Sequence, residues 1–300
     1  MKKILTVLFI TFLILLTGCG KKESNTKYNI ISTTFPGYDF ARAIVKDSED
    51  ISVEMLLSPG GEIHDYDPTP QDIIDIKNCD LFIYVGGESD AWIEDILSDI
   101  DLNKTKVIKL MDLVNLYEEE IIEGMEEESH HEEEEVEYDE HIWTSPKNAI
   151  KIVEKLKEEI INIDNENSDI YRNNATNYIN DLTTIDEDIR EIVNNAKRRE
   201  LVFGDRFPLR YFTEEYGLDY KAAFPGCSHE TEASAKTLSY LIEYVKNNNI
   251  PVIFKIELSN GKIADTIAKE TNVKVLEFHS AHNITKKDYD NGSTYVDFMK

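Results

Sequence analysis

Histidine side chains are the groups in this sequence best suited to chemistry, because imidazole nitrogen is a preferred zinc ligand and three or four such ligands complete a site. Three histidines lie at the ends of predicted elements. His64 follows a predicted strand at 51–57, and His279 follows the last predicted strand at 273–278. His141 ends an acidic segment. His64, His141 and His279 are therefore the candidate ligands of a metal site.

Carboxylates accompany these histidines, and a carboxylate commonly orients a metal-bound imidazole ring. Asp65, Asp139 and Glu140 are sequence neighbours of the candidates, and Glu257 follows a predicted strand at 251–256. The sequence contains neither His-Glu-x-x-His nor Cys-x-x-Cys. Spacing alone therefore does not identify a metal site, and each histidine taken singly is more typical of an exposed loop.

An acidic segment at 118–140 holds 14 Asp and Glu residues and no Lys or Arg, with His130 and His131 in its middle. A run of like charges is typical of a disordered, solvated loop. We expect this loop to gather cations weakly and to raise their local concentration. The formal net charge of the whole chain is -27, which argues against nucleic acid as a partner.

The first residues indicate export. A basic start is followed by an apolar run at 4–16 and by Leu16-Thr17-Gly18-Cys19, after which the sequence becomes polar. This pattern predicts a signal peptide at 1–18, and the apolar run is too short to span a bilayer. The segment resembles a bacterial lipobox, so we expect Cys19 to be lipidated and residues 19–27 to form a tether at the outer face of the cell membrane.

Two further cysteines, Cys79 and Cys227, lie far apart in the sequence. An exported compartment permits a disulfide, but one between these positions would clamp together two halves of the chain. We predict two unpaired thiols.

Short apolar segments alternate with longer amphipathic ones, which is typical of parallel sheets flanked by helices. Strands are predicted at 28–32, 51–57, 81–85 and 106–110, and again at 201–203, 220–223, 251–256 and 273–278. Helices are predicted at 38–46, 70–78 and 91–99, and again at 209–216, 232–247 and 261–271. Apolar residues at helical spacing predict two more helices between these halves, at 146–163 and 169–198.

These elements predict an α/β fold of two lobes, each a parallel β-sheet flanked by helices. The first lobe is expected at 28–165, a long rigid connecting helix at 166–199, and the second lobe at 200–300. Ligands of open α/β sheets bind beyond the carboxyl ends of the strands. The metal site is therefore expected in the cleft between the lobes.

Two segments carry a resemblance to a known family. Gly-Glu-Ile-His-Asp-Tyr-Asp-Pro-Thr-Pro at 61–70 and Asp-Glu-His-Ile-Trp-Thr-Ser-Pro at 139–146 resemble the signature segments of the zinc- and manganese-binding lipoproteins of bacterial ABC importers, solute-binding protein family 9. The second segment departs from the family, which usually has Leu-Asp-Pro where this chain has Thr-Ser-Pro. The resemblance extends over nearly the whole mature chain.

The resemblance implies a set of metal ligands. His64 and His141 match the first two ligands of the family, and His279 falls where many members have an aspartate. The family's third ligand, usually a histidine, aligns with Gly204, which has no side chain to offer. The site is then three histidines with water, or another residue substitutes; the candidates are Asp205, Cys227, His229 and Glu257.

The resemblance also implies a function: an extracytoplasmic receptor, monomeric, that captures a divalent ion and passes it to an ABC permease. Histidine ligands and a histidine-containing loop favour zinc over manganese, which prefers oxygen-rich sites. Two other classes stay open. An exported zinc hydrolase would need an open coordination position and a general base, and a surface adhesin or buffer would hold metal only through the acidic loop.

Overall fold

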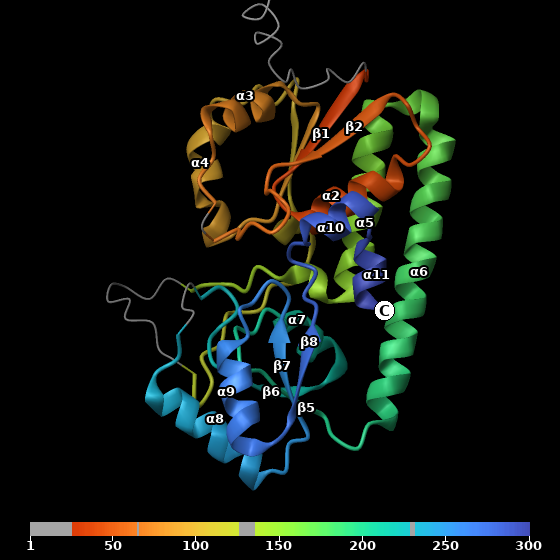
Figure 1. Ribbon diagram of the computed structural model, residues 1–300. Coiled ribbons are helices and arrows are strands. Elements are labelled where there is room, and N and C mark those ends of the chain that lie inside the picture. Colours follow the sequence, from red (N-terminus) through yellow and green to blue (C-terminus); the bar gives the residue numbers. More distant parts are fainter. Residues whose placement is uncertain (1–25, 65, 126–135, 229–231) are drawn as a thin grey trace, which may run out of the picture.

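The computed structural model describes residues 26–64, 66–125, 136–228 and 232–300 (Figure 1). Expectations for Cys19, Asp65, His130, His131 and His229 concern positions outside these ranges. Within the ranges, no helix is long and apolar enough to cross a bilayer.

The first lobe contains a parallel four-stranded sheet in the order β2-β1-β3-β4. Its strands are β1 (Tyr28–Ser32), β2 (Ile51–Met55), β3 (Leu81–Tyr84) and β4 (Lys106–Lys109). Successive residues of a strand point to opposite faces. Ile30 accordingly packs in the core under α2 (Phe35–Ile44), while Ile31 packs under α3 (Pro70–Asn78) and α4 (Ala91–Leu97). Both faces of the sheet are therefore covered.

Two long antiparallel helices lie beside this sheet, α5 (Pro146–Ile163) and α6 (Ser168–Asn195) (Figure 1). Most of the buried face of α6 packs against the first lobe through residues such as Tyr171 and Leu182. Near its end, Val193 packs into the core of the second lobe instead. One continuous helix thus connects the two lobes.

The second lobe is built from two pairs of parallel strands, β5–β6 and β7–β8. The strands are β5 (Glu200–Val202), β6 (Asp219–Lys221), β7 (Val252–Ile256) and β8 (Lys274–Phe278). A parallel bridge between Phe203 and Phe254 joins the two pairs. The helices of this lobe are α7 (Arg210–Tyr216), α8 (Ala235–Asn247) and α9 (Lys262–Thr271). The predicted fold class, two α/β lobes joined by a long helix, is confirmed.

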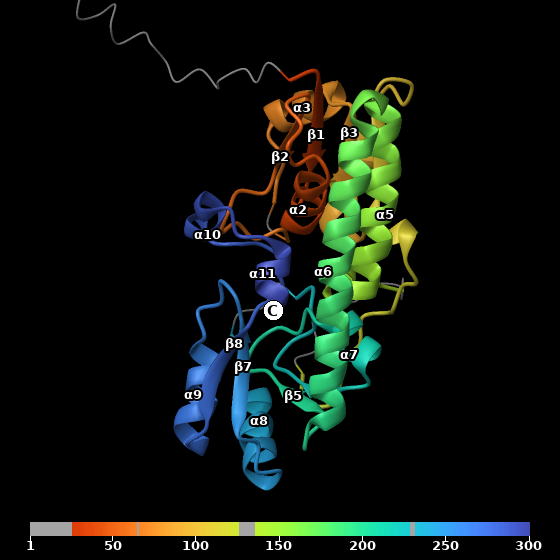
Figure 2. The ribbon, with the colours of Figure 1, turned by 90° about the vertical axis from the view of Figure 1, so that its right-hand side faces the viewer.

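The last two helices, α10 (Lys286–Asn291) and α11 (Tyr295–Met299), return to the first lobe (Figure 2). The backbone N–H of Tyr295 donates to Asp39 Oδ2 at 2.9 Å, and its hydroxyl donates to the carbonyl of Trp143 at 2.6 Å. The sequence analysis placed this segment with the second lobe. It packs on the first because the buried ring of Tyr295 fills a site in that lobe's core.

Short 3₁₀ turns complete the described elements: η1 (Glu88–Asp90), η2 (Leu110–Leu113), η3 (Ile142–Thr144) and η4 (Asn165–Asn167). Cys79 is buried and Cys227 half-buried, and both are free thiols, as predicted.

Candidate metal centre

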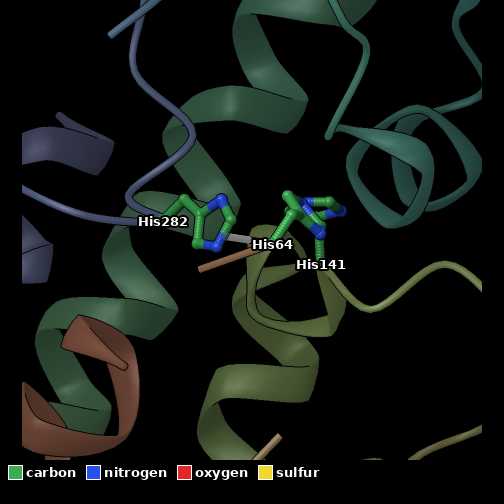
Figure 3. A group of neighbouring side chains, drawn as sticks. All are labelled: His64, His141 and His282. Atoms are coloured by element: carbon green, nitrogen blue, oxygen red, sulfur yellow. The ribbon is translucent and has the colours of Figure 1, made fainter. Parts of the chain in front are cut away.

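Three histidines meet between the lobes: His64, His141 and His282 (Figure 3). One ring nitrogen of each lies within 4.8 Å of the corresponding nitrogens of the other two. His64 is on the loop between β2 and α3, His141 directly precedes η3, and His282 is on the loop between β8 and α10. The structure therefore brings together residues from three distant segments.

The His64 ring is oriented by a hydrogen bond of 2.7 Å between its Nδ1 and Ser89 Oγ. Because Nδ1 is engaged, Nε2 is the nitrogen that can bind a metal ion. Burial, together with the neighbouring rings of His282 and His141, lowers the pKa of His64 to about 2. The ring is therefore neutral at physiological pH, which is the form that ligates metals.

The His141 ring is fully buried and is oriented by a carboxylate. Its Nδ1 donates to Asp139 Oδ1 at 3.1 Å, and its backbone N–H donates to the same oxygen at 2.8 Å. Burial opposes the charged form of the ring, but the Asp139 carboxylate outweighs this effect and raises the pKa of His141. A carboxylate on one imidazole nitrogen leaves the other directed at a metal, as in many zinc sites.

The loop that carries His282 is held by a buried carboxylate, Glu257. This side chain accepts hydrogen bonds from the backbone N–H of Ser280 at 2.8 Å, from the Ser280 hydroxyl at 2.6 Å and from the backbone N–H of His282 at 3.1 Å. Burial, followed by the positive field of His141, lowers the pKa of His282 well below its ordinary value. His282 is thus a second neutral imidazole.

Two further hydrogen-bonding groups tie this loop to the first lobe. The Trp143 indole donates to the carbonyl of Ser280 at 2.9 Å. The Asn283 amide donates to the carbonyls of Ser58 and Gly61 at 3.0 and 2.7 Å, on the loop that carries His64. These contacts hold the loop that carries His282 against the first lobe.

His279 lies outside this group. Its ring stacks on Phe298 with 4.0 Å between ring centroids, and its Nδ1 accepts from the backbone N–H of Ala281 at 2.9 Å. The structure brings together His64 and His141 but not His279, and it adds His282, which the sequence analysis did not select. Both follow β8, three residues apart, so the pattern His-Ser-Ala-His offered two candidates; Ala281, at φ 58°, turns the chain between them.

Gly204 is packed so closely that no side chain fits there. A Cβ at this position would lie 2.5 Å from the Cα and 2.7 Å from the backbone nitrogen of Ala264, in α9. The glycine allows α9 to approach the end of β5. Gly204, which aligns with a metal ligand of the family, therefore packs against helix α9.

Replacing Gly204 with alanine is expected to destabilise the protein by about 1–3 kcal/mol or more, because the added carbon meets backbone and not a movable side chain. Denaturant unfolding of the variant and the wild type measures this difference. An unchanged unfolding midpoint would contradict the close packing of β5 and α9.

The carboxylates of two other candidate ligands, Asp205 and Glu257, accept hydrogen bonds from the protein backbone. Asp205 Oδ1 accepts from the backbone N–H of Arg206 at 2.9 Å, and its Oδ2 from that of Ile256 at 3.3 Å. Both oxygens of Glu257 hold the His282 loop. Cys227 donates its backbone N–H to Glu119 Oε1 at 2.8 Å, and burial raises the pKa of its thiol well above the ordinary value.

A two-lobe α/β fold in which three imidazoles converge between the lobes is typical of a metal-binding class of protein. Comparison with models of known protein families identifies the family to which the chain belongs. Residues 30–300 match the family described as zinc-uptake complex component A, periplasmic, and the chain belongs to that family.

Curated relatives agree with this assignment. The chain is 31% identical over 305 residues to the zinc-binding lipoprotein AdcA of Streptococcus pneumoniae, a match that covers 100% of this chain and 59% of that protein. It is also 31% identical over 300 residues to the high-affinity zinc uptake system protein ZnuA of Bacillus subtilis, covering 96% of this chain and 91% of that one. The chain thus spans about three-fifths of the length of the streptococcal relative.

Solved structures have the same fold. The Zn(II)-bound ZnuA-like domain of Streptococcus pneumoniae AdcA superposes with a TM-score of 0.74 at 30% identity, covering 91% of this chain and 95% of that chain. The metal-dependent lipoprotein YcdH of Bacillus subtilis gives a TM-score of 0.76 at 28% identity, covering 91% and 96%.

Proposed function

We propose that this chain captures zinc with His64, His141 and His282 and delivers it to an ABC permease. The observation that carries the proposal is the approach of three ring nitrogens to within 4.8 Å of one another. Nitrogen ligands favour zinc over manganese, whose sites are rich in oxygen. A manganese receptor of the same family is the alternative.

The protonation states support capture of a cation. His64 and His282 are neutral because burial lowers their pKa values, so zinc need displace no proton from either ring. Hydrogen bonds to Ser89 and Asp139 orient two of the rings, which lowers the entropy lost on binding. These features suit tight and selective binding.

The proposed receptor acts as a monomer outside the cytoplasm and catalyses no reaction. Lipidation of Cys19 would hold it at the membrane surface, close to the permease. The names of its relatives, a zinc-binding lipoprotein and a zinc uptake system protein, support this setting.

Titration with zinc and manganese tests the proposal directly. The wild-type chain is expected to bind one zinc ion tightly and to prefer it over manganese. Tighter binding of manganese would favour the alternative, and the absence of tight binding of either ion would contradict a metal receptor.

Replacing residues 126–135 with a short Gly-Ser linker is expected to leave this one tight site intact. The segment contributes seven acids, His130 and His131, whereas the three-histidine group lies elsewhere. The segments on either side of these residues already lie side by side, because the backbone N–H of Glu119 donates to the carbonyl of Glu137 at 2.9 Å. Calorimetry should show unchanged tight binding and loss of weaker additional sites.

A His130→Ser, His131→Ser variant of full length serves as the control, because it keeps the acidic charge and removes only the imidazoles. Loss of the tight site on deletion would instead indicate a surface buffer that holds metal through the acidic segment.

A further inference from the structure

Two of the three rings are oriented by a hydrogen bond at Nδ1, but their partners differ in kind. Asp139 orients His141 with a carboxylate, and an ionised carboxylate only accepts, so this ring carries a proton on Nδ1. Ser89 orients His64 with a hydroxyl 2.7 Å from Nδ1, and a hydroxyl can either donate or accept. A further group must therefore decide the direction of the hydrogen bond between Ser89 and His64.

The direction of this hydrogen bond matters because a neutral imidazole carries a proton on one nitrogen and a lone pair on the other. If the Ser89 hydroxyl accepts from Nδ1 of His64, the lone pair is on Nε2, which can then bind zinc. If the hydroxyl donates to Nδ1, Nε2 carries the proton and cannot bind until the ring changes tautomer. The second partner of the hydroxyl thus determines whether His64 is ready for an ion.

Glu140 is the second partner of Ser89. Its Oε1 accepts from the backbone N–H of Ser89 at 2.8 Å. Burial raises the pKa of Glu140 to about 7, and hydrogen bonds from the hydroxyl and the backbone N–H of Ser89 act against this rise. When the carboxylate is ionised it only accepts, so the hydroxyl proton is directed at Glu140 and an oxygen lone pair is left for Nδ1–H of His64.

The surroundings of Glu140 hold its carboxylate against the turn that carries Ser89. The side chain is buried, and a Cβ on Gly87 would lie 2.5 Å from its Oε1. Gly87, at φ 85°, has the backbone conformation that favours glycine, and the missing side chain leaves room for the carboxylate. The turn itself, η1, is fastened by Asp90, whose Oδ2 accepts from two backbone N–H groups just after β3 at 2.8 and 2.9 Å. Both partners of the hydroxyl are therefore held in place.

We propose, on the basis of the zinc capture proposed above, that Glu140 is a positioning residue for the ligand His64 and acts through Ser89. Glu140 sets the direction of the Ser89 hydroxyl, which holds the proton of His64 on Nδ1 and leaves Nε2 for zinc. Asp139 does the same for His141 directly. Two consecutive carboxylates thus prepare two ligands that come from different segments, as carboxylates commonly do around metal-bound imidazoles.

The metal-free wild type provides the first test, because its result does not depend on how a variant folds. NMR of labelled ring nitrogens distinguishes a protonated nitrogen from an unprotonated one, and the signals of His64 are identified by their loss in His64→Gln. At about pH 8, where imidazole is ordinarily neutral, His64 is expected to carry its proton on Nδ1. A proton on Nε2 would overturn the proposal.

Glu140→Gln keeps the shape of the side chain but introduces an amide, which donates as well as accepts. The Ser89 hydroxyl is then free to donate to His64, so part of the population is expected to carry the ring proton on Nε2. The His141 ring should keep its proton on Nδ1, because Asp139 is unchanged. A shift of both rings, or of neither, would contradict a role specific to His64.

Competition against a chromophoric chelator measures the consequence for zinc binding. Glu140→Gln is expected to lower zinc affinity at least about 10-fold, and Ser89→Ala to lower it similarly. Adding Glu140→Gln to Ser89→Ala should cause little further loss, because Glu140 acts through the hydroxyl. Equal losses in the two backgrounds would show that Glu140 does not act through Ser89 and would overturn the proposal.

Glu159→Gln is the matched control for affinity. Glu159 is also a buried carboxylate of the first lobe, but it pairs with Lys155 near the end of α5 that is remote from His141. Its zinc affinity should equal that of the wild type, and a comparable loss would attribute the effect of Glu140→Gln to general destabilisation. Failure of the wild type to bind zinc at all would instead overturn the proposed function, whatever tautomer His64 adopts.

Discussion

Replacing His141 with alanine is expected to lower the zinc affinity of this chain by about 100-fold or more. Zinc binding in small structural sites releases about 10–16 kcal/mol. One of four ligands accounts for about 3 kcal/mol of this total, which corresponds to about 100-fold in affinity. His141 is the sharpest of the three positions to test, because its ring is fully buried and Asp139 orients it.

His279→Ala is the control for this experiment and also decides between two ligand sets. His279 stacks on Phe298 outside the group, so its loss should leave zinc affinity nearly unchanged. His282→Ala should weaken binding as strongly as His141→Ala. If His279→Ala abolished binding while His282→Ala did not, the ligands would be those expected from the sequence.

The second large effect concerns stability in acid without metal. His64 has a pKa of about 2 in the folded chain and His282 one well below the ordinary value, whereas both titrate near 6.5 when unfolded. As the pH falls below 6.5, the unfolded chain therefore takes up protons on these two rings more readily than the folded chain does. His64 then costs about 1.36 kcal/mol of stability per pH unit, or about 2–3 kcal/mol between pH 6.5 and 4.5, and His282 acts in the same direction.

Other buried groups act in the opposite direction over this range. Burial raises the pKa of Glu140 to about 7 and that of Asp90 to about 6, so the folded chain takes up these protons first and gains stability as pH falls. The pKa of His141 is also raised, so this ring binds its proton more readily in the folded chain and adds stability as the pH falls. The effect of the two histidines must therefore be isolated by comparison.

The comparison is between the wild type and the double variant His64→Gln, His282→Gln, unfolded by denaturant at pH 6.5 and 4.5 without metal. Glu140, Asp90 and His141 are present in both proteins, so their contributions largely cancel. The wild type is expected to lose at least about 2–3 kcal/mol relative to the variant, a substantial share of the 5–15 kcal/mol typical of a folded domain. A constant difference between the two proteins would show that these rings are not held neutral by the fold.

Local sequence patterns predicted the secondary structure well. The helix expected at 146–163 is found at Pro146–Ile163, and the one expected at 70–78 at Pro70–Asn78. In α3, Thr69 and Asp72 form a reciprocal capping box, a contact made within four residues of sequence. Signals of this kind depend only on near neighbours, so they can be read before the chain folds.

Long-range contacts were the part that these patterns could not predict. Tyr295 fills the first lobe although it follows the second in sequence. Its partner Trp143 is 152 residues away. Hydrophobic periodicity indicates that α11 has a buried face but not which core accepts it.

By itself the sequence determined the α/β fold, its two lobes and the long helix between them, because strand and helix alternation is set by local periodicity. It also selected His64 and His141 as candidates. Only the tertiary structure decided that His282, and not His279, joins them. The choice depends on a turn at Ala281 and on the hydrogen bonds of Glu257 to residues 23 and 25 positions away. The tertiary structure likewise brought Arg206 to Glu62 across 144 residues, because only packing of the two lobes makes such positions neighbours.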